Sequence, residues 1–344
     1  MTLFSQALEQ LRLAAVNVPG LTSLADAPFL FRPLIMVVLL GVVAGVIGVI
    51  INLRSAEFSA EAMVHAVFPG IVAGAVYWGI NAIIPAASVV AVAAALVLTI
   101  VSHRARRGEA SEAGTAVVLT SFFSIGLILS LAKGDMSGQL EALMFGRLLE
   151  VTDERLAQAL IVCVVALVLI AATWKEQVAY AFDRTGARAS GLRLLALDLV
   201  LNTAIAAAVV SASTAVGTLL VIGYLVIPGA TARILASRVR TMVLVAIAVG
   251  VGGGYLGMLL MALPETLDKP VSPQAAVALV MTAILLLAVG IAAARERLRG
   301  ALRRARSVQA AVPTTASRAG ADDASHDAAA VRDAEASLAE GSRV

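Results

Sequence analysis

Apolar blocks of about 20 residues recur along most of this chain, and their length is what most constrains its fold. A helix needs about 20 predominantly apolar residues to cross the hydrocarbon core of a bilayer. The chain is 60% hydrophobic and only 14% charged, whereas about 25% of the residues in an average soluble domain are charged. The blocks are rich in Ala, Leu and Val without alternation, which excludes the strands of a membrane barrel. The sequence therefore predicts an all-α, polytopic membrane protein.

The blocks predict about nine membrane-spanning helices within a transmembrane domain at residues 31–294. We place the helices at residues 34–52, 58–79, 84–102, 114–132, 156–174, 193–212, 215–233, 241–262 and 273–293. The loops on the same side as the C-terminus hold most of the 26 Lys and Arg residues. Because cytoplasmic loops are enriched in these residues, we expect a cytoplasmic C-terminus and an N-terminus outside.

The two ends of the chain differ from the apolar blocks. Residues 1–30 should form an extracytoplasmic segment, with a short amphipathic helix at residues 3–16. Arginines are concentrated in residues 295–306, which predicts a basic helix at the inner membrane surface, in contact with lipid. Residues 307–344 have few large apolar side chains, so we expect a disordered cytoplasmic tail.

Glu61 and His65 are the ionisable pair that most strongly suggests a function. They lie four residues apart in an expected span, so a helix would place them on one face. Ionisable groups at membrane depth are costly, and this favours a functional role over a buried structural pair. A carboxylate and an imidazole suit zinc, manganese or iron, and they can also relay a proton. Further metal ligands would have to come from another helix, a partner subunit, water or the backbone.

Two Pro-Gly pairs, Pro69-Gly70 and Pro228-Gly229, fall inside apolar blocks and predict interrupted helices. Interrupted membrane helices occur where the freed backbone is buried in protein or lines a wet cavity. For either pair alone, a passive kink is the alternative. Two such pairs favour a cavity, with the interrupted helices lining a pathway.

Other polar and small residues of the spans have a structural interpretation. Asp198 and Asn202 also lie four residues apart, and we expect them to bond to a neighbouring helix or to a loop. Glycines at helical spacing predict close packing of the first and eighth spans: Gly41, Gly45, Gly48, Gly250, Gly254 and Gly257.

Motifs for hydrolysis are absent from the sequence. It has no phosphate-binding Gly-x-x-x-x-Gly-Lys-Ser/Thr loop, no His-Glu-x-x-His and no Gly-x-Ser-x-Gly. The basic residues follow the membrane topology and do not form a nucleic-acid face. We therefore expect neither an enzyme nor a nucleic-acid partner.

Four stretches, in order, resemble the permease subunits of ATP-binding-cassette importers for zinc and manganese. Residues 60–70 fall on the family's second-span motif, Gly-Asp-Ala-Leu-Ser-His-Ala-x-Leu-Pro-Gly, and residues 215–233 resemble its seventh-span signature. Residues 122–126 and 143–149 are similar to two other family stretches. Glu61 replaces the family's Asp and Val64 replaces a Ser, so the chain resembles a divergent member.

The resemblance implies a multi-pass cell-membrane protein that imports a divalent metal, with no permanently bound cofactor. It implies that Glu61 and His65 lie on the metal pathway. It also implies a homodimeric or paired permease, separate cytoplasmic ATPase subunits that hydrolyse ATP, and an external metal-binding lipoprotein. The loop at residues 175–192, in which we expect a short amphipathic helix ending at a glycine, falls where the family docks its ATPase. The coupling residues would be Phe182, Asp183, Ala187 and Gly191.

Three alternatives remain open. A secondary carrier could move the metal with protons, using His65 as the relay. A membrane scaffold could use only the tail at residues 307–344. A permease for metal chelates ranks lower, because a wide chelate pathway has no need for a paired acid and imidazole.

Overall fold

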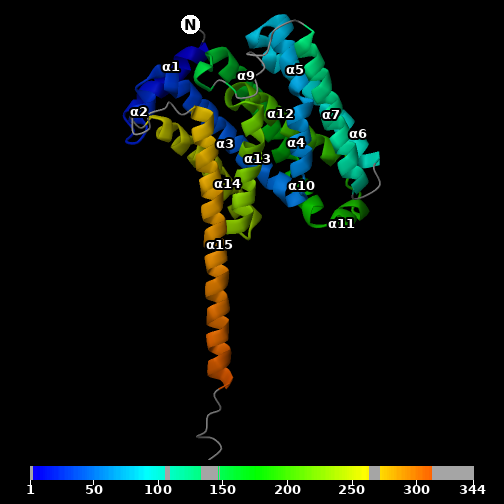
Figure 1. The fold of residues 1–344 in the computed structure, drawn as a ribbon, viewed down its shortest axis with the longest axis vertical. Helices are drawn as coiled ribbons and strands as arrows, with labels where there is room; N and C mark the ends of the chain where they lie inside the picture. The colour runs from blue at the N-terminus through cyan, green and yellow to red at the C-terminus, as the bar shows by residue number, and fades with distance from the viewer. Residues whose placement is uncertain (1–2, 105–108, 133–145, 147, 263–271, 312–344) are drawn as a thin grey trace, which may run out of the picture. The chain divides into compact units, whose positions relative to one another are not determined.

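The computed structural model describes residues 3–104, 109–132, 146, 148–262 and 272–311, and every regular element in these residues is helical (Figure 1). The chain divides into two units, Met1–Gly290 and Ile291–Val344. The described part of the second unit is the C-terminal portion of one long helix. The predicted all-α class is therefore confirmed.

The long apolar elements coincide with the predicted spans. They are α3 (Pro28–Arg54), α4 (Glu57–Ala66) with α5 (Phe68–Ala73) and a π-helix (Gly74–Trp78), α6 (Ile83–Arg104), α7 (Glu109–Leu131), α9 (Asp153–Ala172), α12 (Leu194–Val216), α13 (Thr218–Leu235), α14 (Val239–Ala262) and α15 (Pro273–Ala311). Eight stretches of the described chain are long and apolar enough to cross a membrane, and Leu220–Leu235 of α13 is a shorter ninth.

Short helices connect or precede these spans. They are α1 (Leu3–Val16), α2 (Thr22–Ala25), α10 (Trp174–Phe182), α11 (Arg184–Ala189) and two 3₁₀ turns, Ile80–Ala82 and Leu148–Glu150. The predicted helix at residues 3–16 is confirmed as α1.

Two helices extend beyond the predicted boundaries. α3 begins at Pro28 instead of residue 34, because a proline is well accommodated in the first turn of a helix. α15 continues to Ala311, so the first residues of the expected disordered tail are helical. The rest of the tail, residues 312–344, and residues 143–145 and 147 of the third family-like stretch lie outside the described residues.

α3 is the central helix of the first unit, and 72% of its most apolar stretch is buried. It packs against α9, α10, α12, α13 and α14. Its glycines permit this, as predicted. A Cβ on Gly41 would lie 2.6 Å from the carbonyl carbon of Gly250, and a Cβ on Gly45 would lie 2.7 Å from the Cα of Ile247. Small residues let two backbones approach closely where lipid gives no hydrophobic drive.

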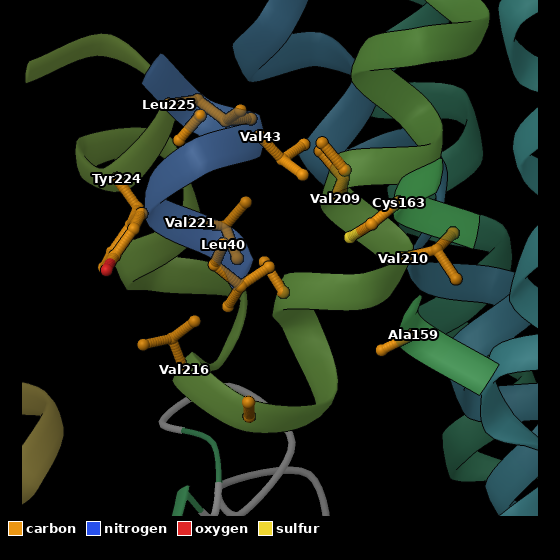
Figure 2. Packing of buried hydrophobic residues seen from close by; sticks show 14 of the residues in the cluster. Leu40, Val43, Ala159, Cys163, Val209, Val210, Val216, Val221, Tyr224 and Leu225 are labelled. Atoms are coloured by element: carbon orange, nitrogen blue, oxygen red, sulfur yellow. The ribbon is translucent and has the colours of Figure 1, made fainter. Parts of the chain in front are cut away.

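Figure 2 shows the adjoining core, in which α3 and α13 face α9 and α12. Leu40 and Val43 of α3 belong to the same buried cluster as Val209 of α12 and Cys163 of α9. The Cys163 side chain is fully buried, which confirms its place as a small core residue. The Tyr224 hydroxyl lies within hydrogen-bond distance of two carbonyl oxygens, at 3.0 Å from Val37 and 3.1 Å from Gly250.

Replacing Gly250 by alanine should destabilise the fold by about 1–3 kcal/mol, because the new methyl group would overpack the α3–α14 contact. The Cβ would lie 2.6 Å from the carbonyl oxygen of Gly41. The measurement is the thermal unfolding midpoint in detergent. Gly252→Ala is the matched control, since its Cβ would meet nothing within 4 Å. Equal midpoints for the two variants would contradict the packing argument.

Candidate functional site

Glu61 and His65 both lie on α4, whose unbroken turns place them on one face. Both side chains are partly exposed, whereas the intervening Ala62, Met63 and Val64 are buried. The helix therefore turns its apolar side to the core and leaves the acid and the imidazole on its open side. This is the arrangement expected from the spacing.

The imidazole of His65 is positioned by an aromatic neighbour that the sequence analysis did not single out. The ring of Phe123 on α7 meets it edge to face, with centroids 5.3 Å apart and planes at 83°. Phe123 in turn lies 5.2 Å from the ring of Phe68 on α5. These contacts restrict the orientation of the imidazole ring. The available signal was that Phe123 lies within residues 122–126, one of the four family-like stretches.

Glu61 and His65 have no hydrogen-bond or ion-pair partner in the described part of the chain. No group of three or more His, Cys, Asp or Glu side chains that could hold a metal occurs among these residues. A carboxylate oxygen and an imidazole nitrogen are thus both available as metal ligands.

The second span is interrupted directly after His65, as predicted from Pro69-Gly70. α4 ends at Ala66, Val67 separates the helices, and Pro69 lies in the first turn of α5. Proline has no N–H, so the regular bond from residue 69 to the His65 carbonyl cannot form. Gly70 is buried, and its Cβ would lie 2.7 Å from the Cα of Ala87 on α6, so it serves close packing.

The predicted interruption at Pro228-Gly229 is wrong. α13 runs without a break from Thr218 to Leu235, with Pro228 inside it. The neighbouring α3 supports this helix, since the Asn52 side-chain amide donates to the Val226 carbonyl at 3.3 Å. A Cβ on Gly229 would lie 2.3 Å from the carbonyl oxygen of Gly48. These contacts pack α13 against α3 along the turn that contains Pro228.

The loop at residues 175–192 contains two short helices where one was predicted. Asp183 separates α10 from α11 and caps the latter, since its carboxylate accepts from the Gly186 amide at 2.8 Å. Gly191 ends the segment with a φ of +82°, which favours glycine. Phe182 is 71% exposed, whereas Ala187 is buried in a small cluster with Tyr180. Of the expected coupling residues, Phe182, Asp183 and Gly191 are exposed, and Ala187 is buried.

A cavity of about 1260 Å³ lies between this segment, the start of α4 and the adjoining ends of α6 and α12. Its lining includes Ser59, two residues before Glu61, but neither Glu61 nor His65. Four arginines line it: Arg54, Arg184, Arg188 and Arg193. The cavity therefore adjoins the start of α4 without including the ionisable pair in its lining.

The fold and the second span together define a multi-pass helical membrane protein whose interrupted second span carries a glutamate and a histidine on one face. The ABC 3 transport family matches residues 26–292. The chain belongs to this family, and the resemblance drawn from residues 60–70 and 215–233 is confirmed.

Similar proteins are permeases of bacterial metal transport systems. The manganese transport system membrane protein MntC of Listeria monocytogenes is 34% identical over 239 residues, 69% of this chain and 83% of that protein. The chelated iron transport system membrane protein YfeC of Yersinia pestis is 32% identical over 62% of this chain and 70% of its own. The solved structure of PsaBC from Streptococcus pneumoniae has a TM-score of 0.67 at 25% identity, covering 78% of this chain and 94% of that one.

Asp183→Ala should remove the cap of α11 and destabilise that helix by about 1 kcal/mol, because the Gly186 amide loses its acceptor. Hydrogen exchange of the segment measures this as faster exchange at Gly186. Asp183→Asn is the control, since its side-chain oxygen can still accept the bond. Slow exchange in the alanine variant would show that the cap is dispensable.

Proposed function

We propose that this chain is the membrane-spanning permease subunit of an ABC importer for a divalent transition metal, with manganese favoured over zinc. The observation that carries the proposal is the pair Glu61 and His65 on one face of α4 beside the helix interruption, with no hydrogen-bond partner among the described residues. Ionisable groups in a span are costly unless they serve a ligand. The mixture of oxygen and nitrogen suits manganese, whereas zinc prefers sites richer in nitrogen or sulfur. Relatives named as manganese transport proteins support this choice.

In this function Glu61 and His65 hold the ion transiently as it passes the interrupted span. Since one chain supplies two side chains, a second copy in a homodimer, with water, completes the coordination. An external binding protein delivers the ion, and a separate cytoplasmic ATPase docks on α10 and α11, with Phe182 exposed toward it. This orientation has the C-terminus inside, in agreement with the distribution of arginines.

His65→Ala and Glu61→Gln should each lower metal uptake about tenfold or more, because each removes one of two ligands. Uptake of radioactive Mn²⁺ by cells that depend on this permease is the measurement. Glu57→Gln, which changes an acid one turn earlier on α4, is the matched control and should retain full uptake. Unchanged uptake in the His65→Ala strain at equal membrane abundance would refute the proposed site.

Uptake should require the ATPase and should prefer manganese. In proteoliposomes that contain the permease with its ATPase, Mn²⁺ should enter only with ATP, and excess unlabelled Mn²⁺ should compete better than Zn²⁺. Uptake driven by a pH gradient without ATP would instead identify a proton-coupled carrier. Stronger competition by Zn²⁺ would reverse the choice of metal and leave the importer intact.

A further inference from the structure

Arg54, the last residue of α3, joins three elements at one point. Its guanidinium donates to the side-chain oxygen of Gln177 on α10 at 2.7 Å and pairs with the carboxylate of Asp198 on α12. The same group lies 3.9 Å from the centre of the Tyr180 ring on α10. The Arg54 side chain is only 9% exposed, so these contacts are poorly screened by water.

The partners of Arg54 are themselves held in place. Gln177 is fully buried, and its amide donates to the Leu197 carbonyl of α12 at 2.9 Å. The Tyr180 hydroxyl donates to the second oxygen of Asp198 at 3.4 Å. Burial and the neighbouring Asp198 carboxylate raise the pKa of Tyr180, so the hydroxyl keeps its proton at neutral pH. The network therefore joins α10 to α3 and α12 as one body.

A short, strained turn connects Arg54 to α4, the helix that carries Glu61 and His65. Ser55 ends α3 with a φ of +52° and is the only non-glycine residue with positive φ among those described. α4 begins at Glu57, so Glu61 lies about one helical turn into α4. A turn this short cannot absorb a displacement as a flexible loop would. The cavity beside it, lined by Ser55, Ser59 and Arg54, leaves room for the start of α4 to move.

We propose that Arg54 is a positioning residue for transport. It fixes the segment α10–α11 to α3 and α12, so that a displacement of this segment reaches the Ser55 turn and reorients α4 with Glu61 and His65. This inference rests on the proposed function, because the ATPase is what would displace the segment. The alternative is that Arg54 only stabilises the fold. In that case Arg54 would not link ATP to the position of α4.

The test places a reporter on α4 and asks whether it senses ATP. Cys163 is fully buried, so Ser59→Cys in the cavity wall can be labelled selectively with an environment-sensitive fluorophore. In the full complex with the ATPase, ATP should change the fluorescence of the parent. Arg54→Gln should reduce that change about fivefold or more, in the range of typical coupling energies. Arg193→Gln is the matched control, because Arg193 lines the same cavity but its side chain has no bonded partner in the described chain.

A second readout is the number of Mn²⁺ ions transported per ATP hydrolysed. Arg54→Gln should lower this ratio about fivefold or more while the ATPase still co-purifies with the permease. If Arg54 only stabilised the fold, Arg54→Gln would lower uptake and ATP hydrolysis in proportion. The ratio would then be unchanged, and that result overturns the proposal. If the glutamine variant does not fold, Arg54→Lys replaces it, because lysine can pair with Asp198 but cannot reproduce the planar fork. Parental values of both readouts in the lysine variant also overturn it.

The two proposals fail separately in these experiments. A parent complex that transports no divalent metal but whose reporter responds to ATP through Arg54 refutes the metal importer and supports the link. A complex that transports Mn²⁺ with its parental ratio after Arg54→Gln refutes the link alone. If ATP does not change the fluorescence of the reporter in the parent, the link is refuted as well.

Discussion

The close contact between α3 and the pair α13–α14 is the constraint on which the remaining structure depends. Between helices in lipid the gain comes from van der Waals contact, so backbones must approach closely. The glycines permit this close approach. A Cβ on Gly48 would lie 2.3 Å from the carbonyl oxygen of Leu225, and a Cβ on Gly229 would lie 2.3 Å from the carbonyl oxygen of Gly48. Arg233 adds a polar tie by donating to the Asn52 carbonyl at 2.6 Å. With α3 fixed, its end at Arg54 has a defined position.

Local properties of the chain could be predicted from the sequence, whereas distant pairings could not. Block length located the spans because bilayer thickness sets it, and the spacing of Glu61 and His65 predicted their shared face because helix geometry sets it. Pro228 misled because a proline within an apolar segment can either end a helix or be accommodated inside it, and the neighbouring residues do not decide which. Asp198 and Asn202 were expected to bond to other elements, and they bond to Arg54 and Thr99. Those partners are 144 and 103 residues away in sequence, so only the fold identifies them.

The Glu61–His65 pair and the network around Arg54 are separate in the structure. Glu61 has no ion-pair partner among the described residues, whereas Asp198 pairs with Arg54. Arg54 pairs with Asp198 and also contacts Gln177 and Tyr180, so its charge does not neutralise Glu61. Under the proposed function, an arginine paired with Glu61 would compete with the metal ion for that carboxylate. The separation of Arg54 from Glu61 therefore leaves the carboxylate open to a cation, while Arg54 keeps its own partners.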